Sequence, residues 1–282
     1  MKKIVDNWKK LTSDSKGLDI VQNCHIEFDE DKEVNLNFVS HQTVFNENQS
    51  VIITDEIKKL VEKNALIEVQ ECHGQFLSPI FLRPKKNGEF RMILNLKKFN
   101  ENVKYYHFKM DTFESAIQLI TKGTFMASVD LRHAYYSVNM APEHQIFLRF
   151  MWDNKIYQYT CLPNGLACAP RFFTKLMKPV CAKLRSLGFV NVGYIDDSLL
   201  CGDTKRECQR NVFETTSLMK ELGFMINVEK SVLVPQKQIT ILGNIIDSDQ
   251  MIVILPTEKQ EIIVNECKKL YKRDKDTIRN VA

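Results

Sequence analysis

The chain has 282 residues, of which 44% are hydrophobic and 26% are charged, and its formal net charge at pH 7 is +4. This composition is that of an ordinary soluble globular protein with one large domain or two smaller ones, and the mild positive charge permits a nucleic-acid partner without indicating one. The first residues lack the apolar core of a signal peptide, no apolar run is long enough to span a membrane, and there is no Cys-x-x-Cys pair. We therefore expect an intracellular protein, cytoplasmic or nuclear, with no membrane contact and no zinc knuckle.

The N-terminal part of the chain contains no recognisable chemistry. Residues 1–49 are polar and of mixed charge, and we interpret them as an N-terminal arm that is either extended or packed as a lead-in. A helix is expected to begin at Thr54, because Thr is a good N-cap residue and because acidic residues and a periodic apolar face follow it.

A basic β-hairpin is expected next. Apolar segments at residues 80–82 and 90–94 flank a turn with an Asn-Gly pair, which is typical of tight hairpins. Lys85 lies in this turn and Arg91 lies in the strand that follows, so the hairpin carries positive charge near its tip. These cations belong either to an ordinary solvated turn or to a flap that grips phosphate groups.

An apolar strand at residues 125–131 carries a carboxylate near its end. This residue is Asp130, which could simply cap the next turn. Tyr135 and Tyr136 follow directly, and such an aromatic pair can stack on a sugar or a base. A helix that begins at Asp111 is expected to precede the strand.

A second hairpin at residues 147–159 is expected to lead into a tight loop and a helix. The loop is Leu-Pro-Asn-Gly-Leu at residues 162–166, and it contains Asn164 and Gly165. Pro170 begins the helix, whose periodic apolar residues are typical of core packing and not of a cofactor site.

Two adjacent carboxylates lie at the tip of a predicted hairpin at residues 190–201. Apolar residues run up to Asp196 and Asp197, and a second apolar run follows at once. Neighbouring carboxylates repel each other and burial favours their protonation, a cost that a divalent cation such as Mg²⁺ would remove. For the pair taken alone, an exposed acidic turn is the simpler alternative, because Asp is favoured in turns.

The C-terminal part is expected to contain two helices and two strands. A capping box at Thr204 begins one helix, and a last helix begins near Thr257. Residues 224–233 and 239–246 are expected to be strands. Strands and helices thus alternate irregularly along the chain, which is typical of the α+β class.

Taken in order, these segments resemble the motifs of a reverse transcriptase over about residues 50–250. Tyr-Ile-Asp-Asp at residues 194–197 is similar to the family's YxDD box, and the segment around Asp130 is similar to its first aspartate motif. The loop at residues 162–166 is similar to the template-and-nucleotide loop, although Asn164 stands where relatives often carry Gln or Phe. With the basic hairpin and a Gly-Phe-x-x-Asn-x-x-Lys segment, five boxes occur in the right order. Among reverse transcriptases, the chain looks most like a retrotransposon enzyme of the gypsy or DIRS type.

The resemblance implies a right-hand polymerase fold of fingers, palm and thumb. An N-terminal arm would precede the fingers, the palm would end in the primer grip, and only the start of a thumb would follow. The expected ranges are 1–49 for the arm, 50–104 and 141–160 for the fingers, 105–140 and 161–246 for the palm, and 247–282 for the truncated thumb. No RNase H segment or other part of a retroelement polyprotein is recognised, so a fragment or an isolated domain is expected.

The resemblance also implies an enzyme, an RNA-directed DNA polymerase. It would transfer deoxynucleotides from deoxynucleoside triphosphates to the 3′-hydroxyl of a primer on an RNA or DNA template. Two Mg²⁺ ions, for which Mn²⁺ could substitute, would neutralise the charge of phosphoryl transfer while bound to the carboxylates of Asp130, Asp196 and Asp197. Lys230 would protonate the leaving pyrophosphate, or it is an ordinary surface lysine.

The remaining family positions would bind the nucleotide and the primer. Lys85 and Arg91 would clamp the phosphates of the nucleotide, and Tyr135 would stack beneath its sugar and exclude a 2′-hydroxyl. The other expected contacts are Leu131, Asn164 and Gly165 for the nucleotide and Leu242 and Gly243 for the primer grip.

Three alternatives stay open at this point. The chain could be a decayed or domesticated element that only binds nucleic acid. It could be an RNA-dependent RNA polymerase or another palm-type transferase, although Tyr135 at the sugar position argues against RNA synthesis. Least favoured is a structural α+β protein whose acidic residues coincide with the motifs.

Overall fold

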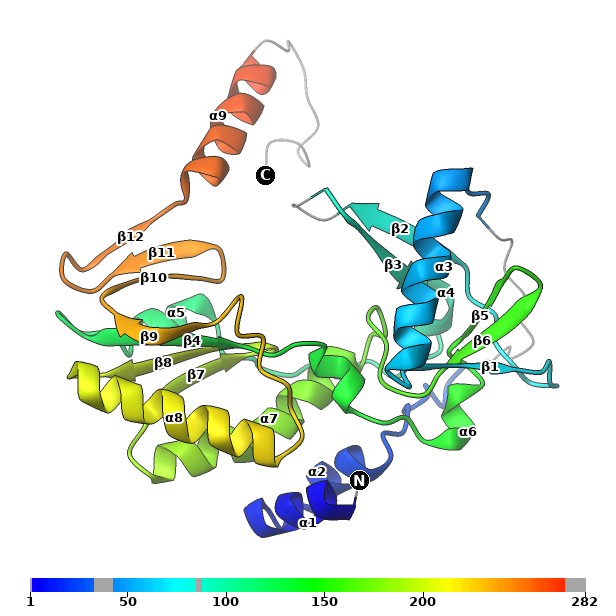
Figure 1. Cartoon of the computed structure of the whole chain (residues 1–282), viewed down its shortest axis with the longest axis horizontal. Helices are drawn as coiled ribbons and strands as arrows, with labels where there is room; N and C mark the ends of the chain where they lie inside the picture. Colours follow the sequence, from blue (N-terminus) through cyan, green and yellow to red (C-terminus); the bar gives the residue numbers. More distant parts are fainter. Residues whose placement is uncertain (1, 33–42, 85–87, 272–282) are drawn as a thin grey trace.

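The computed structural model describes residues 2–32, 43–84 and 88–271 of the chain. These residues form helices and largely antiparallel sheets, so the expected α+β class is confirmed. Figure 1 shows two lobes side by side, with the N-terminal helices below them in this view and a single helix rising at the C-terminal end. None of the described helices is long and apolar enough to cross a membrane.

A four-stranded antiparallel sheet is the centre of the first lobe. In sheet order its strands are β7 (Val190–Tyr194), β8 (Asp197–Gly202), β4 (Phe125–Asp130) and β9 (Val232–Gln236). Two long helices pack on one face: α7 (Ala169–Ser186) and α8 (Lys205–Glu221). The opposite face carries α5 (Phe113–Ile117) and a small sheet of β10 (Gln238–Ile241), β11 (Asn244–Asp247) and β12 (Ile252–Ile254).

The strand β4 is buried on both of its faces. Ala127 and Val129 belong to the larger hydrophobic core with α7 and α8, whereas Met126 belongs to a smaller core shared with β10 and β11. A strand covered on both faces has a nearly continuous apolar sequence, which explains why this strand is recognisable before its partners are known. Its last residue, Asp130, is half-buried.

The second lobe contains a three-stranded sheet, a separate hairpin and three helices. In sheet order the strands are β1 (Leu66–Val69), β6 (Lys155–Tyr159) and β5 (Arg149–Trp152), and the hairpin is β2 (Ile80–Pro84) with β3 (Phe90–Leu94). The helices are α3 (Glu47–Glu62), α4 (Lys97–Asn100) and α6 (Pro142–Gln145). Both hairpins expected in this part of the chain are therefore confirmed. Asp153 and Asn154 close the β5–β6 turn with φ of 49° and 56°, as a type I′ turn requires.

The N-terminal helices α1 (Lys2–Leu11) and α2 (Ser15–Gln22) pack against the first lobe. Trp8 is only 2% exposed, and its Nε1 donates a hydrogen bond to the carbonyl oxygen of Leu222 at 3.1 Å. Asn7 donates likewise to the carbonyl oxygen of Glu221 at 2.7 Å. These carbonyls lie at the C-terminal end of α8, where a helix has no internal donors for them. Of the two interpretations of the N-terminal arm, the packed lead-in is right for these helices.

The helix α3 begins before the expected position. Asn46 is its N-cap residue and forms a reciprocal capping box with Gln49. Thr54 lies inside the helix, where its hydroxyl donates to the carbonyl oxygen of Ser50 at 2.9 Å. The expected start at Thr54 is therefore wrong, because the complete capping box lies upstream of it.

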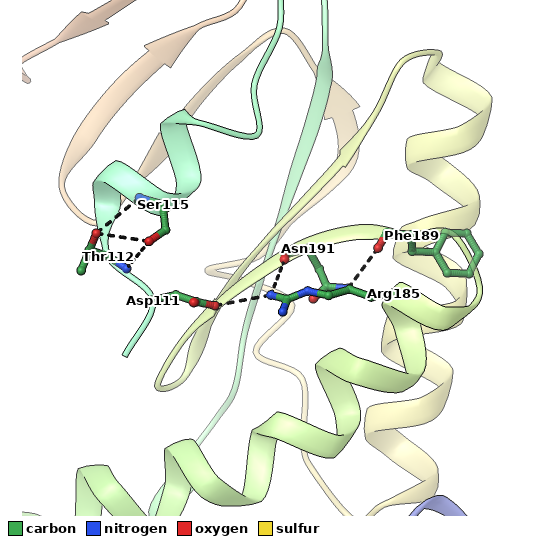
Figure 2. A network of polar contacts seen from close by, with 6 residues as sticks. All are labelled: Asp111, Thr112, Ser115, Arg185, Phe189 and Asn191. Atoms are coloured by element: carbon green, nitrogen blue, oxygen red, sulfur yellow. Dashed lines mark hydrogen bonds and ion pairs between the residues drawn. The ribbon is translucent and has the colours of Figure 1, made fainter. Parts of the chain in front are cut away.

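Asp111 does not cap α5, whose N-cap residue is Thr112. The Asp111 carboxylate pairs instead with Arg185 of α7 at 3.5 Å, and Arg185 also donates to the carbonyl oxygen of Asn191 at 3.0 Å, as Figure 2 shows. One guanidinium thus connects the segment before α5, the end of α7 and the start of β7.

The C-terminal part confirms the expected helices and corrects the expected strands. Thr204 and Glu207 form the capping box of α8, and α9 (Thr257–Tyr271) begins where expected. Only the first two residues of β9 fall within residues 224–233, because the backbone N–H groups of Lys230 and Ser231 both donate to the carbonyl oxygen of Asn227 and close a turn before the strand. Residues 239–246 form the β10–β11 hairpin and not a single strand.

The buried indole predicts that the N-terminal helices contribute to stability. Trp8→Ala should lower the free energy of unfolding by about 3–5 kcal/mol, because a large buried side chain and its hydrogen bond are both lost. Urea denaturation followed by circular dichroism measures this loss, with the exposed neighbour Lys9→Ala as the control. Equal stability of the two variants would contradict the packing of α1 against α8.

Candidate active site

Three aspartates meet at one end of the four-stranded sheet. Asp130 ends β4 and lies directly opposite Asp197, the first residue of β8, and Asp197 lies opposite Tyr194 of β7. Side chains directly opposite each other in an antiparallel ladder project from the same face. Asp196 occupies the turn between β7 and β8, and its carbonyl oxygen accepts a hydrogen bond from the N–H of Leu131 at 2.9 Å. The hairpin expected from the sequence, with its two carboxylates at the tip, is thus confirmed.

The β7–β8 turn has an unusual backbone conformation. Ile195 has φ of 54°, in the left-handed region that a β-branched residue rarely occupies. Its half-buried side chain packs against the larger core, and this packing offsets the cost of the conformation. Strained backbone of this kind often occurs at functional sites. Here it fixes the position of Asp196.

A second turn supports Asp130 from the other side. The backbone N–H of Asp130 donates to Ser231 Oγ at 3.0 Å, and its carbonyl oxygen accepts from the N–H of Asn227 at 2.9 Å. Ser231 Oγ in turn donates to the carbonyl oxygen of Asn227 at 2.7 Å. Ser231 was not predicted as a site residue, because nothing near it in the sequence marks the contact. The same turn carries Lys230, whose side chain is exposed.

The carboxylates influence one another electrostatically. The pKa of Asp197 is raised to about 6, first by burial and then by the negative charges of Asp196 and Asp130, which outweigh the opposite effect of Lys230. The pKa of Asp196 is also raised, first by removal of water and then by Asp130, although the side chain remains exposed at the surface. Lys230 and Arg91 both lower the pKa of Asp196, so two cations act on the same carboxylate from different lobes.

The oxygen atoms of these carboxylates are suitable ligands for a hard divalent cation. Three carboxylates that lie close together repel one another, and a bound cation would offset this electrostatic repulsion. Within residues 2–32, 43–84 and 88–271, however, no three side chains of His, Cys, Asp or Glu converge closely enough to hold a metal ion by themselves. Asp130, Asp196 and Asp197 are therefore neighbouring carboxylates whose charges act on Asp196 and Asp197, and they are not a finished coordination shell.

The two predicted tyrosines lie on a short 3-10 helix, η1 (Ala134–Ser137), directly after the Asp130 strand. Tyr135 is half-buried with its ring edge against Phe173. The pKa of Tyr135 is raised to about 12, first by burial and then by the negative charge of Asp196 and by Tyr194. The phenol of Tyr135 therefore lies near enough to Asp196 to be influenced by its charge. Tyr136 stacks on His133 instead, at 5.5 Å between ring centroids.

The loop with Asn164 and Gly165 is held by the second lobe. Asn100, at the end of α4, donates through Nδ2 to the carbonyl oxygen of Gly165 at 2.9 Å, and its Oδ1 accepts from the N–H of Ala167 at 2.9 Å. Gly165 has φ of 97°, and a Cβ there would lie 3.2 Å from the carbonyl oxygen of Leu94. The exposed Asn164 amide reaches the hydroxyl of Tyr136 at 3.5 Å. Asn100 was not predicted either, because its partners lie far along the chain.

The basic hairpin carries two arginines, of which Arg91 lies near enough to lower the pKa of Asp196. Arg91 on β3 lies opposite Arg83 on β2, and both side chains are exposed. Arg83 was not singled out in the sequence, although its register opposite Arg91 gives the hairpin a second cation. Lys85 lies outside the described residues, so its role stays a prediction.

The predicted primer-grip residues form the β10–β11 turn. Strand β9 runs away from the Asp130 end of β4. Figure 1 shows β10 running back in the opposite direction, so Leu242 and Gly243 lie toward the same end as the aspartates. Strand β10 packs on the smaller core with Val192 and Leu199, on the sheet face that also carries Asp130. The turn and the carboxylates therefore share one face and one end of the sheet.

The raised pKa of Asp197 predicts a pH-dependent effect on stability. Folding disfavours the ionised carboxylate, so the stability contributed by this group is complete below the ordinary pKa of 3.8 and is lost as the pH rises through about 6. Asp197→Asn cannot ionise, so its stability relative to the parent should improve by about 1 kcal/mol between pH 4 and pH 8, after allowance for solvent screening. Urea denaturation in EDTA measures this, with exposed Asp203→Asn as the control. A constant difference across this range would contradict the electrostatic account.

Comparison with known proteins identifies the family of the chain. The sequence profile described as "Reverse transcriptase (RNA-dependent DNA polymerase)" matches residues 83–246, which is more than half of the chain. This stretch includes all three aspartates, the Asn164 loop and the β10–β11 turn.

Individual relatives share the same region at low identity. The Pro-Pol polyprotein of Simian foamy virus type 3 (strain LK3) is 24% identical over 202 residues, which are 72% of this chain and 17% of the relative. The Transposon Tf2-3 polyprotein of Schizosaccharomyces pombe is 23% identical over 191 residues, which are 68% of this chain and 14% of the relative. The chain thus spans less than a fifth of the length of these relatives.

A solved structure gives the fold. The foamy viral protease-reverse transcriptase in complex with an RNA/DNA hybrid superimposes with a TM-score of 0.68 at 21% identity, over 80% of this chain and 29% of that chain. The expected right-hand polymerase fold is confirmed by this likeness. Because the family profile covers more than half of the sequence, the chain belongs to the reverse transcriptase family.

Proposed function

We propose that this chain is the polymerase part of a retroelement reverse transcriptase of the gypsy or DIRS type. It copies an RNA or DNA template by transferring deoxynucleotides to a primer 3′-hydroxyl. The observation that carries the proposal is the meeting of Asp130, Asp196 and Asp197 at one end of the sheet, with Lys230 and Arg91 acting on them. The printed names of the relatives, a Pro-Pol polyprotein and a transposon polyprotein, support a retroelement.

Reverse transcriptases generally use a divalent metal ion, and we propose that the three aspartates hold two Mg²⁺ ions, with Mn²⁺ as a substitute. The ions would supply charge neutralisation for the primer oxygen and the triphosphate. The raised pKa values of Asp196 and Asp197 support this assignment, because a cation favours the ionised form of both groups.

The surrounding residues would bind and orient the nucleotide. Arg91, together with Lys85, binds its β- and γ-phosphates through charge-assisted hydrogen bonds. Lys230 lies close enough to act on Asp196 and Asp197 electrostatically, and it can donate a proton to the leaving pyrophosphate.

The other predicted contacts orient the base and the two strands. The backbone at Leu131 and the Asn164–Gly165 loop form the walls of the nucleotide site, and Leu242 with Gly243 holds the primer end.

The two lobes would correspond to the fingers and the palm of the polymerase. In this proposal the palm is formed by residues 105–140 and 161–246, which include the four-stranded sheet and its helices. The fingers are formed by residues 50–104 and 141–160. Asn100 would hold the two together at the nucleotide loop, since it lies in the fingers and bonds to the backbone of Gly165 and Ala167. Helix α9 would begin the thumb.

Removing one carboxylate charge tests the proposed activity. Asp196→Asn should abolish extension of a DNA primer on an RNA template, because the metal loses a charged ligand, while primer–template affinity changes by less than about threefold. Extension with Mg²⁺ and binding by fluorescence anisotropy provide the two readouts. The exposed Asp203→Asn variant is the matched control and should extend normally.

Two results would contradict this proposal. One is extension by Asp196→Asn at the rate of the parent. The other is a parent protein that binds primer–template without extending it, which would mean a binding module and not a polymerase.

The choice of sugar tests the role of Tyr135. Its ring should overlap a 2′-hydroxyl, and overpacking of this kind costs about 1–3 kcal/mol, with a rigid site at the upper end. Since about 1.4 kcal/mol is a factor of ten, we expect at least about tenfold discrimination against ribonucleotides. Tyr135→Ala should admit ribonucleotides while deoxynucleotide incorporation falls. Tyr135→Phe keeps the ring and should keep the selectivity, and Tyr136→Phe is a second control because it loses only the hydroxyl near Asn164.

Single-nucleotide incorporation of matched deoxy- and ribonucleotides gives the ratio directly. A folded Tyr135→Ala variant with the parent's ratio would show that the ring does not select the sugar.

A further inference from the structure

A cavity of about 500 Å³ lies between helix α2 and the first two turns of α7. Its other walls come from the chain at residues 23–27 and from residues 106–108. Figure 1 shows α2 below α7, on the side of that helix away from the sheet, whereas the carboxylate of Asp130 projects from the opposite sheet face. The cavity is therefore separate from the candidate active site, and its volume is in the usual range for small-molecule sites, roughly 300–1,000 Å³.

A buried arginine forms part of the cavity wall. The side chain of Arg171 is only 7% exposed, and its Nη2 donates to Glu27 Oε2 at 2.7 Å. Its Cζ lies 4.2 Å from the ring centroid of Tyr106 and 4.9 Å from that of Phe172. The ion pair and the two aromatic rings hold the guanidinium group in one position, so the wall is preorganised.

The contacts of Arg171 leave part of its guanidinium group unsatisfied. Its Nε is buried and has no hydrogen-bond partner within residues 2–32, 43–84 and 88–271. A buried N–H group of a cation without an acceptor is unfavourable, and negative charge in the adjoining cavity would offset this cost. Helix α7 contributes in the same direction, because its N-cap residue Cys168 makes no side-chain hydrogen bond to the positive end of this 18-residue helix.

Two lysines face the cavity from different helices. Lys175 of α7 is half-buried, and Lys16 of α2 is exposed. The pKa of Lys175 is lowered, first by burial and then by the positive charge of Arg171, which acts on it more strongly than the negative charge of Glu27 does. Lys16 acts on Lys175 in the same direction as Arg171. The wall is therefore positive at Lys175 although a carboxylate is present, which favours an anionic ligand.

The remaining wall residues indicate more than a bare anion. Tyr106, His107 and Phe108 line the cavity in succession, and rings of this kind can stack on a base. Asp19 lines it beside Lys16, and a carboxylate can accept hydrogen bonds from the hydroxyl groups of a sugar. We propose that this cavity binds a nucleoside phosphate, with the phosphate group between Lys16 and Lys175 and the base against residues 106–108. The proposal goes beyond the polymerase assignment and does not depend on it.

Titration calorimetry with adenosine monophosphate tests the proposal. The full chain is used in EDTA, so that no metal supports binding at the aspartates. Lys175→Gln should weaken binding at least about tenfold, because one charge-assisted contact is lost while the side chain remains polar and of similar length. Lys178→Gln removes the same charge from an exposed position of the same helix that does not line the cavity, and it should bind as the parent does. Thermal unfolding without ligand should be the same for both variants.

Two further comparisons locate the ligand and identify its parts. Arg91→Ala, on the basic hairpin, should leave the affinity unchanged, and the amide resonances of residues 106–108 and 171–175 should shift on titration. Ribose 5-phosphate should bind more weakly than adenosine monophosphate, because it lacks the base.

Four results would overturn the proposal. They are the absence of binding by the parent, equal affinities of Lys175→Gln and Lys178→Gln, equal affinities of the parent for ribose 5-phosphate and adenosine monophosphate, and a loss of binding in Arg91→Ala but not in Lys175→Gln. The last result would place the nucleotide at the basic hairpin. None of these readouts requires primer extension, so a failure of the proposed polymerase activity would leave them unchanged.

Discussion

The antiparallel pairing of β4 with β8 is the constraint on which the site depends. This ladder sets Asp130 opposite Asp197 and brings the β7–β8 turn, with Asp196, to the same end. The three negative charges repel one another, as the raised pKa of Asp197 indicates. Burial of the same strands on both faces, in two hydrophobic cores, holds them together. The apolar residues of the sheet therefore stabilise an arrangement that its polar end destabilises, and a bound cation would remove the conflict.

Backbone contacts do most of the positioning around the carboxylates. Asp130 is held through its own N–H and carbonyl oxygen by the Asn227–Ser231 turn, and Asp196 through its carbonyl oxygen by Leu131. These backbone contacts do not involve the carboxylate oxygens of Asp130 and Asp196. The nucleotide loop follows the same principle, because Asn100 bonds to backbone groups and leaves the Asn164 side chain at the surface.

The elements that could be predicted from the sequence are those with local causes. The β7–β8 hairpin, the apolar stripe of α7 and the Thr204 capping box all depend on residues close in the chain, and the order of the motifs indicated the family. The start of α3 could not be predicted so easily, because Asn46 and Thr54 are both good N-cap residues. Asn46 is the N-cap residue in the structure, where it forms a complete capping box with Gln49. Ser231 supports Asp130 across 101 residues of sequence, and Arg171 pairs with Glu27 across 144. Such contacts carry no local signal.

The central claim is that these three carboxylates form one metal-binding catalytic site. Anomalous diffraction from crystals of the protein with Mn²⁺, a primer lacking its 3′-hydroxyl, a template and the matching deoxynucleotide tests it most directly. The account predicts manganese peaks in contact with the carboxylates of Asp130, Asp196 and Asp197, next to the nucleotide phosphates. Manganese bound elsewhere, or a nucleotide whose phosphates lie away from the Asp130–Asp197 end of the sheet, would contradict it.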